Sequence, residues 1–375
     1  METTAIVADE WQYVLNMMPA DLEESARAML AFQRRREVDS AATLLRLALC
    51  YGFCDMSLRQ LGAWAEGSGV AHLSDVAILQ RLRCASAWLG HLLLRWLQDR
   101  GLSTDVPPVA VRVVDATSIS QAGSQGTDWR VHLGLDLARL RIHTAELTGA
   151  EQGETLQRHA LAPGEIALAD AGYAHRAGVA SVLEAAAHVV VRINWQNFPL
   201  ETRRGRLLDV VACLETLQPG DIGDWQVQFR VEARVYRVRL VAVPMSRAAA
   251  EHARKRLRRT TTRKRRRADR RSLRAARFVY VITDMSRESL PAPEVLELYR
   301  LRWQIEMAFK RLKGIVRLGH LRAHDPQLAR AYLYAKLLGA LILDELCHGA
   351  LAFSPWGYGL FPQAAEPVAC AAGGG

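Results

Sequence analysis

Four side chains able to grip a phosphate or a metal ion recur at helical spacing near the C-terminal end. Tyr299, Arg302, Glu306 and Lys313 stand at offsets of 0, 3, 7 and 14. In one continuous helix, at about 100° per residue, they share an arc of about 60°, and Lys310 lies beside it. A phenol, a carboxylate and two cations on one line, next to a buried edge, make an unusual polar face that could bind phosphate.

The helix that carries these residues is predicted to span 293–313. An apolar stripe adjoins the polar line and predicts that the helix packs on a larger body; its members are Leu301, Ile305, Ala308, Phe309 and Leu312. The alternative is a solvated face on which Arg302 and Glu306 form an ordinary pair four residues apart. Partner carboxylates elsewhere in the chain would favour the functional interpretation.

Two aspartates supply such partners. Asp115 ends the β-branched run 109–115, and Asp170 ends the short apolar run 165–170. Open α/β sheets place their sites at the carboxyl ends of strands, although a single Asp there is often only a turn former. With Glu306 they make three carboxylates, which are stable at one point only around cations. Hard oxygen ligands suit Mg²⁺ or Mn²⁺.

The segments around the aspartates alternate between strand and helix. Strands are predicted at 129–136 and 140–146, a helix at 151–159, a second helix at 175–187 and a strand at 188–193. This order is typical of an α/β fold with a mixed sheet.

The N-terminal part is predicted to be helical from residue 10 to 100. Ser57 and Gln60 match a capping box for a short helix that ends at Gly67, and Ser74 can cap a long helix that runs to about Gly101. A short helix, a turn and a longer helix fit either a helix-turn-helix reader of DNA or plain bundle packing, and no residue decides between them.

A β-rich, basic insertion separates Asp170 from Glu306. Residues 226–244 alternate apolar and charged side chains, as half-exposed antiparallel strands do, and 278–283 is a further strand. Between them, 254–277 holds 14 Lys or Arg and one acid, whereas the rest of the chain has 35 basic and 38 acidic residues. This segment is a helix or a disordered loop, and Thr260–Thr262 favours a local break. Its charge predicts contact with nucleic acid; the alternative is a localisation-like or solubilising tract.

The remaining features predict an intracellular protein without a membrane span. The six cysteines form no Cys-x-x-Cys pair and have no histidines at zinc spacing, which is typical of a reducing compartment. The first ten residues are acidic, unlike a signal peptide. Lys336 and Asp344 interrupt the apolar run 331–347, so we expect a buried helix there, within a last helix over 326–349. A tail rich in Gly, Ala and Pro follows and is predicted to be disordered.

The pattern Tyr-x-x-Arg-x-x-x-Glu-x₆-Lys resembles the signature helix of bacterial insertion-sequence transposases of the family numbered four. Asp115 in Val-Val-Asp-Ala-Thr is similar to that family's first catalytic Asp, and Asp170 in Ala-Asp-Ala-Gly-Tyr to its second. The resemblance covers residues 40–345, including a β-rich insertion in the same gap. One position departs from it: the family often has Arg where this chain has Ala171, and Arg176 or Arg192 could substitute.

The resemblance implies an RNase H-like mixed-sheet core that cuts and joins DNA. It implies two Mg²⁺ or Mn²⁺ ions, with Asp115 bridging them and Asp170 and Glu306 each completing one. Tyr299 would contact a phosphate or orient Glu306. The residues expected to contact DNA are Tyr299, Arg302, Lys310 and Lys313 and, in the basic segment, Arg263, Lys264, Arg265, Arg266 and Arg267. The partners would be transposon ends and target DNA, bound by a homodimer in the cytoplasm near the nucleoid.

Three alternatives remain at this point. The chain could be an RNase H-like nuclease that cuts without joining, a catalytically inactive DNA-binding protein of the same fold, or an RNA-binding protein that uses the Arg-rich segment alone. The predicted organisation is a helical region for DNA ends (1–106), the first part of the core (107–195), a β-rich insertion with the basic segment (196–285), the second part of the core (286–350) and a tail (351–375).

Overall fold

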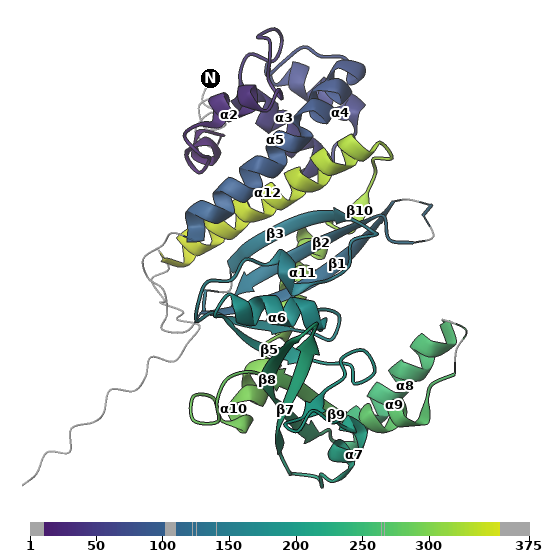
Figure 1. Ribbon diagram of the computed structural model, residues 1–375. Helices are drawn as coiled ribbons and strands as arrows, with labels where there is room; N and C mark the ends of the chain where they lie inside the picture. The colour runs from purple at the N-terminus through teal and green to yellow at the C-terminus, as the bar shows by residue number, and fades with distance from the viewer. Residues whose placement is uncertain are drawn as a thin grey trace, which may run out of the picture.

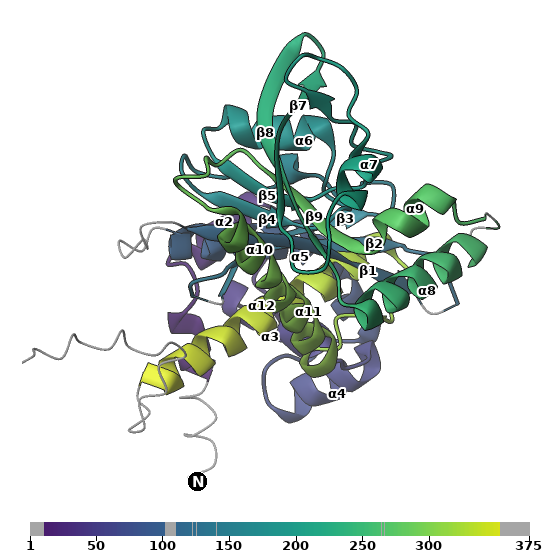
Figure 2. The same ribbon diagram turned by 90° about the horizontal axis from the view of Figure 1, so that it is seen from below.

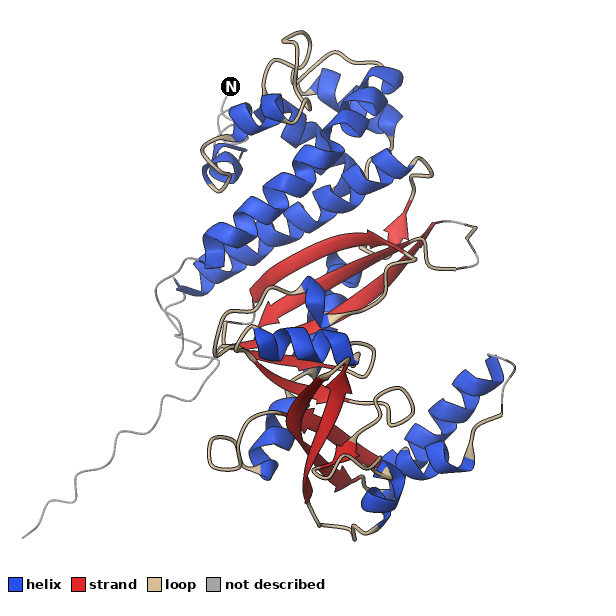
Figure 3. Cartoon of the chain, in the orientation of Figure 1, coloured by secondary structure: helices blue, strands red, loops and turns tan. Residues whose placement is uncertain are grey.

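The structure is a computed structural model, and it describes residues 11–101 and 110–352 apart from Ala122, Gln125, Leu140, Lys264 and Arg266. A helical layer lies at the N-terminal end, a long mixed sheet follows, and a helical arm leaves the far end of that sheet (Figures 1 and 3). Residues 351 and 352 of the predicted tail end the last helix, and the rest of the tail lies outside the described residues.

The N-terminal layer consists of α2 (Leu22–Ala28), α3 (Ala41–Gly52), α4 (Leu58–Gly67) and α5 (Asp75–Gly101). The predicted caps are confirmed: Ser57 and Gln60 form a capping box on α4, and Ser74 Oγ accepts a hydrogen bond from Ala77 N at the start of α5. These polar contacts fix where the two helices begin, independently of the packing of their apolar faces.

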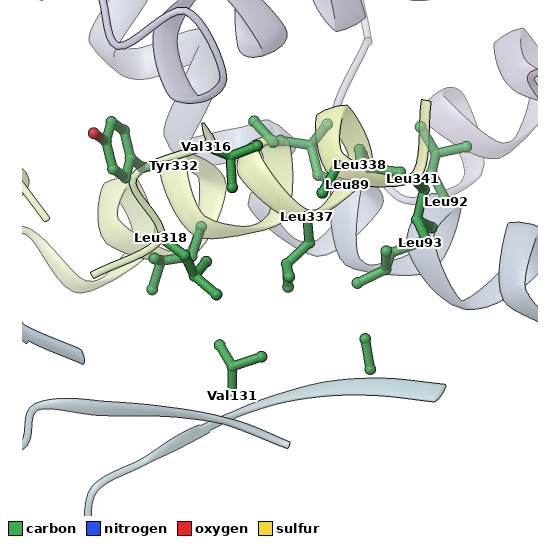
Figure 4. Packing of buried hydrophobic residues seen from close by; sticks show 14 of the residues in the cluster. Leu89, Leu92, Leu93, Val131, Val316, Leu318, Tyr332, Leu337, Leu338 and Leu341 are labelled. Carbon is green, nitrogen blue, oxygen red and sulfur yellow. The ribbon is translucent and has the colours of Figure 1, made fainter. Parts of the chain in front are cut away.

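The long helix α5 packs along the last helix, α12 (Pro326–Ala352). Leucines of both helices interdigitate above Val131 of the sheet (Figure 4). Gly52 allows a similarly close approach of α3 to α12, because a Cβ there would lie 2.6 Å from Tyr332 O. The predicted buried helix is therefore confirmed, and it joins the helical layer to the sheet.

The sheet order is β3-β2-β1-β4-β5-β9-β8-β7-β6. The strands are β1 (Val111–Gln121), β2 (Trp129–Asp136), β3 (Arg141–Gly149), β4 (Ile166–Ala169), β5 (His188–Arg192), β6 (Glu201–Thr202), β7 (Gly223–Val231), β8 (Arg234–Pro244), β9 (Phe278–Thr283) and β10 (His320–Leu321), which pairs with the end of β1. The strands β1, β2 and β3 are antiparallel, and β4 and β5 are parallel to β1. This arrangement is an RNase H-like core. The mixed α/β fold is thereby confirmed.

Residues along the central strands alternate between two hydrophobic cores, as the period of a strand requires. Val113 faces the core shared with α5, α12 and the helices α10 (Ala292–Arg300) and α11 (Trp303–Ile315). Its neighbour Val114 faces the second core, covered by α6 (Arg176–Glu184) and α7 (Val210–Glu215). Figure 2 shows α10 and α11 following one another on the face that α12 also covers.

The differences from the predictions include the length of one strand and the type of one helix. The strand predicted to end at Asp115 continues to Gln121, because β2 pairs with it as far as Ile119, whereas its parallel pairing with β4 ends at Val114. The helix predicted over 151–159 is only a 3₁₀ turn, η1 (Leu156–Arg158).

The prediction of one helix over 293–313 was wrong. The chain forms α10 and α11, joined at Leu301 and Arg302. Arg302 N donates to Tyr299 O, and Ile305 N donates to Arg302 O, so the junction uses bonds between residues three apart. These tighter 3₁₀ turns rotate the chain faster than an α-helix and move Tyr299 off the face that carries Glu306.

The basic segment is mostly helical, as α8 (Arg247–Arg263) and α9 (Arg270–Ala275). The expected break at Thr260–Thr262 was wrong. Thr260 and Thr261 each donate a hydroxyl hydrogen bond to the carbonyl four residues earlier, at 3.0 Å, so their side chains do not compete for the helix N–H groups. The helix instead ends at Arg263.

No described helix combines the length and apolar character needed to cross a membrane. The cysteines in the described part of the chain are free thiols.

Candidate active site

Asp115 and Asp170 lie side by side because their strands are adjacent and parallel. Val114 of β1 pairs with Ala169 of β4, and each aspartate is the next residue. Asp170 Oδ1 accepts a hydrogen bond from Gly172 N at 2.7 Å, and Asp115 Oδ1 accepts one from Ala116 N at 2.8 Å. These local bonds orient the two carboxylates at the same edge of the parallel pair.

Burial dominates the electrostatics of Asp115. Desolvation raises the pKa of its carboxyl to about 6, and the nearby charge of Asp170 acts in the same direction, while the Ala116 N–H and the Arg302 guanidinium lower it. A desolvated carboxylate beside a second one favours a bound cation, because a cation compensates both charges.

Arg302 connects Asp115 to Glu306. Its Nη2 lies 2.5 Å from Glu306 Oε1, and its Nη1 lies 3.9 Å from Asp115 Oδ2. The Arg302 side chain is 18% exposed, whereas that of Glu306 is 49% exposed. The structure therefore brings Asp115, Asp170, Arg302 and Glu306 to one region, and the guanidinium stands between the Asp pair and the Glu.

Tyr299 is buried, in contrast to the expectation of a shared polar face. Its ring centroid lies 5.9 Å from Arg302 Cζ, within the range of a cation–π contact, and burial raises the pKa of its phenol. Tyr299 thus braces Arg302 from the core side. Lys310 and Lys313 are exposed on α11, and neither forms an ion pair with another described residue.

The basic arm, formed by α8 and α9, is separate from the carboxylates of Asp115, Asp170 and Glu306. It leaves the sheet where β8 ends and β9 begins (Figures 1 and 2). Arg263, Arg265 and Arg267 are exposed near its tip, while Lys264 and Arg266 lie outside the described residues. A cleft of about 1000 Å³ at its root is lined in part by Arg254 and Arg258.

The two arginines considered as substitutes at Ala171 have other contacts. Arg176 Nη1 donates to Arg230 O of β7 at 3.1 Å. The charge of Arg192 on β5 acts on the phenol of Tyr299 and lowers its pKa, against the larger effect of burial.

Glu154, which lies between β3 and η1, was not among the predicted site residues. Its side chain is 30% exposed and rests against Gly172 beside Asp170. Burial and the charge of Asp170 raise the pKa of its carboxyl. No local pattern distinguished Glu154, because the segment around it was predicted to be an ordinary helix.

A buried polar network supports the turn that follows Asp170. The Tyr173 hydroxyl lies 3.2 Å from His132 Nδ1, and His132 Nε2 lies 3.0 Å from Thr148 Oγ1. Burial lowers the pKa of His132 to about 4, so the imidazole is neutral at pH 7. These bonds join the Asp170 turn to β2 and β3.

The donors present fit a divalent cation. Asp115, Asp170, Glu154 and Glu306 offer carboxylate oxygens, the hard ligands that Mg²⁺ and Mn²⁺ prefer. Within the described chain, no three such side chains stand close enough to hold an ion. Bound cations would therefore draw them together against their mutual repulsion.

Comparison with known proteins identifies the family. A model of the transposase DDE domain matches residues 109–343. The putative transposase InsL of insertion sequence element IS186A from Escherichia coli K12 is 37% identical over 92% of this chain and 96% of its own length. The transposase of element IS421 from Escherichia coli shows the same identity and the same coverage.

The solved structures add a cryo-EM structure of the piggyBac transposase synaptic complex with hairpin DNA. It has a TM-score of 0.48 and 8% identity, over 91% of this chain and 76% of that one. DDE transposases act on DNA and generally use divalent metal ions. On the family model and the identity to the insertion-sequence proteins, this chain belongs to the DDE transposases of bacterial insertion sequences.

Proposed function

We propose that this transposase cuts and joins DNA at a site made by Asp115, Asp170 and Glu306. The observation that carries the proposal is the double contact of Arg302, which reaches Asp115 on β1 and Glu306 on α11. Asp170 lies beside Asp115 through the parallel pairing of their strands. Two carboxylates from separate elements thus contact one guanidinium, and the third lies beside Asp115.

The ions that we propose are two Mg²⁺ or Mn²⁺ per site. Asp115 would contribute to both, and Asp170 and Glu306 to one each. When bound, such ions activate the attacking oxygen and stabilise the leaving oxygen of an in-line phosphoryl transfer. The protein's part is to orient the carboxylates, and the hydrogen bonds from Gly172 N and Ala116 N already orient the two aspartates.

The cationic side chains hold the DNA. The Arg302 guanidinium leaves Glu306 and binds a phosphate oxygen of the transposon end. The ring of Tyr299 keeps the Arg302 guanidinium aligned. Lys310 and Lys313 project from the same helix and bind neighbouring phosphates. Water first hydrolyses a phosphodiester at the element's end, which frees a 3′-hydroxyl. That hydroxyl then attacks a target phosphodiester, displacing the target's own 3′-oxygen and leaving the element joined to the target.

Two regions outside the site also bind DNA in this proposal. The N-terminal helices bind the transposon ends, and the exposed arginines of the arm contact the backbone of the same DNA or of the target. We expect two copies of the chain to assemble with the two transposon ends. This assembly would take place in the bacterial cytoplasm, at the nucleoid.

Strand joining by the purified protein tests this proposal. Linear DNA carrying the element's ends is incubated with a target plasmid and Mg²⁺, and cleaved and joined products are resolved on gels. Asp115→Asn, Asp170→Asn and Glu306→Gln should each bind the ends like the wild type and form neither product. Glu297→Gln, in an exposed pair with Arg300 on α10, is the matched control and should retain both steps. Cleavage by one of the three variants would remove that residue from the site.

A further inference from the structure

Glu154 adjoins Asp170 at Gly172, where an added Cβ would meet oxygens of both carboxylates. We propose that Glu154 is a further ion-binding residue of this site and contributes a carboxylate oxygen beside Asp170. The inference rests on the proposed function, because it places Glu154 at the same divalent ion.

The close approach depends on Gly172. Residues 170–173 form a tight turn in which Tyr173 N donates to Asp170 O. A Cβ added to Gly172 would collide with Glu154 Oε2 and would lie 3.0 Å from Asp170 Oδ1. The missing side chain therefore lets oxygens of both carboxylates lie close to the Cα of Gly172.

The cationic side chains near Glu154 in the described chain are Arg130 and His175. Glu154 accepts no hydrogen bond from another described residue, and the cation paired with it, Arg130, reaches it only through Nε at 4.0 Å. Arg130 instead donates from Nη1 to Gln152 O. Glu306, by contrast, is half exposed and held by Arg302 at 2.5 Å. Carboxylates that are partly desolvated, adjacent and weakly paired are stabilised by a divalent cation.

The backbone on both sides of Glu154 is fixed, so the carboxylate is preorganised. Thr155 Oγ1 accepts from Gln157 N, and the side chain of Leu156 is completely buried. Arg158 Nε donates to Gly153 O at 3.2 Å. Such anchoring is needed for an ion ligand, and an incidental surface glutamate would not require it.

Binding of Mn²⁺ to the full-length protein without DNA provides the test. Free Mn²⁺ is measured by electron paramagnetic resonance during titration. Glu154→Gln should lower the affinity about 10- to 100-fold, the range typical for loss of a group that supports a metal site. Glu151→Gln changes an exposed carboxylate three residues away and should bind Mn²⁺ like the wild type.

Arg130→Gln separates ion binding from a structural ion pair. If Glu154 only pairs with Arg130, both variants lose the same thermal stability and Glu154→Gln keeps wild-type Mn²⁺ affinity, which would overturn the inference. If Glu154 binds the ion, Arg130→Gln keeps or raises that affinity. The Mn²⁺-induced rise in Tm gives a second readout that is independent of each variant's baseline stability.

The aspartate variants distinguish the two levels of failure. Reduced Mn²⁺ affinity in Asp115→Asn with unchanged affinity in Glu154→Gln refutes the role of Glu154 and leaves the proposed site intact. Wild-type affinity in Asp115→Asn, Asp170→Asn and Glu154→Gln together refutes both.

Discussion

Arg302 holds Glu306 through an ion pair of 2.5 Å across the first turn of α11. The same guanidinium lies 3.9 Å from Asp115, so one protein cation stands between carboxylates that the reaction needs around divalent ions. A DNA phosphate can replace the half-exposed carboxylate as the partner of the guanidinium, because both anions accept two parallel hydrogen bonds from its planar fork. Arrival of the transposon end would then free Glu306 for an ion.

The first prediction concerns Arg302 and Lys313. Arg302→Ala and Lys313→Ala should fold normally and lose cleavage at the transposon end, with a larger defect on intact duplex than on ends already nicked. Both effects follow if these cations position the scissile phosphate. Rates on the two substrates measure the difference. Arg300→Ala, which removes an exposed cation two residues from Arg302, is the control. Wild-type joining by both variants would show that Arg302 and Lys313 do not position the scissile phosphate.

Tyr299 should act through its ring and not through its hydroxyl. Tyr299→Phe keeps the face that contacts Arg302, so we expect cleavage within a few-fold of the wild type. Tyr299→Ala removes a buried aromatic ring and should lower the free energy of unfolding by about 3–5 kcal/mol. Urea unfolding and single-turnover cleavage are the measurements. Complete loss of cleavage in Tyr299→Phe would show instead that the hydroxyl contacts the DNA.

The arm should contribute sequence-independent affinity. Replacing Arg263, Arg265 and Arg267 with Gln should weaken binding to specific and random duplexes alike. The slope of log affinity against log salt should fall by about 0.9 for each phosphate that the variant no longer neutralises. Fluorescence anisotropy between low and moderate salt measures both quantities. An equal number of changes at Arg203, Arg204 and Arg206, exposed in the β6 region, serves as the control. An unchanged slope in the arm variant would mean that these arginines face solvent and contact no DNA phosphate.

Lys336 predicts a pH dependence of stability. It is completely buried, its Nζ donates to Val316 O at 2.6 Å and lies 4.7 Å from the ring centroid of Tyr332. Burial lowers its pKa to about 8, with Arg317 and Arg322 acting in the same direction and Asp55 against them. Above pH 8 the folded chain releases a proton that the unfolded chain keeps to about pH 10.4.

Stability contributed by this group therefore rises with pH between about 8 and 10, by at most about 1.4 kcal/mol per unit. The free energy of unfolding of the wild type minus that of Lys336→Met should increase over pH 7.5–9.5 in urea titrations. Lys310→Met, at an exposed site, should show no such trend. A difference that stays constant with pH would mean that Lys336 keeps its ordinary pKa in the folded protein.

Local signals in the sequence were sufficient for several elements. Ser57 and Gln60 cap α4 because a capping box needs only residues three apart. The alternation of Val113 and Val114 follows from the period of a strand, and Asp170 follows β4 directly, as the short apolar run predicted. The order of these elements also predicted the mixed sheet.

The tertiary structure decided what depends on partners far along the chain. Asp115 lies inside a strand because β2 continues the pairing after β4 has ended. The break at Leu301 and Arg302 turns Tyr299 into the core, although helix propensity alone favours continuity. Glu154 reaches Asp170 only because Gly172 leaves space in a turn folded against it. Residue types and short spacings could indicate the carboxylate chemistry, but the distances between the carboxylates arise from long-range packing, which no local window of sequence contains.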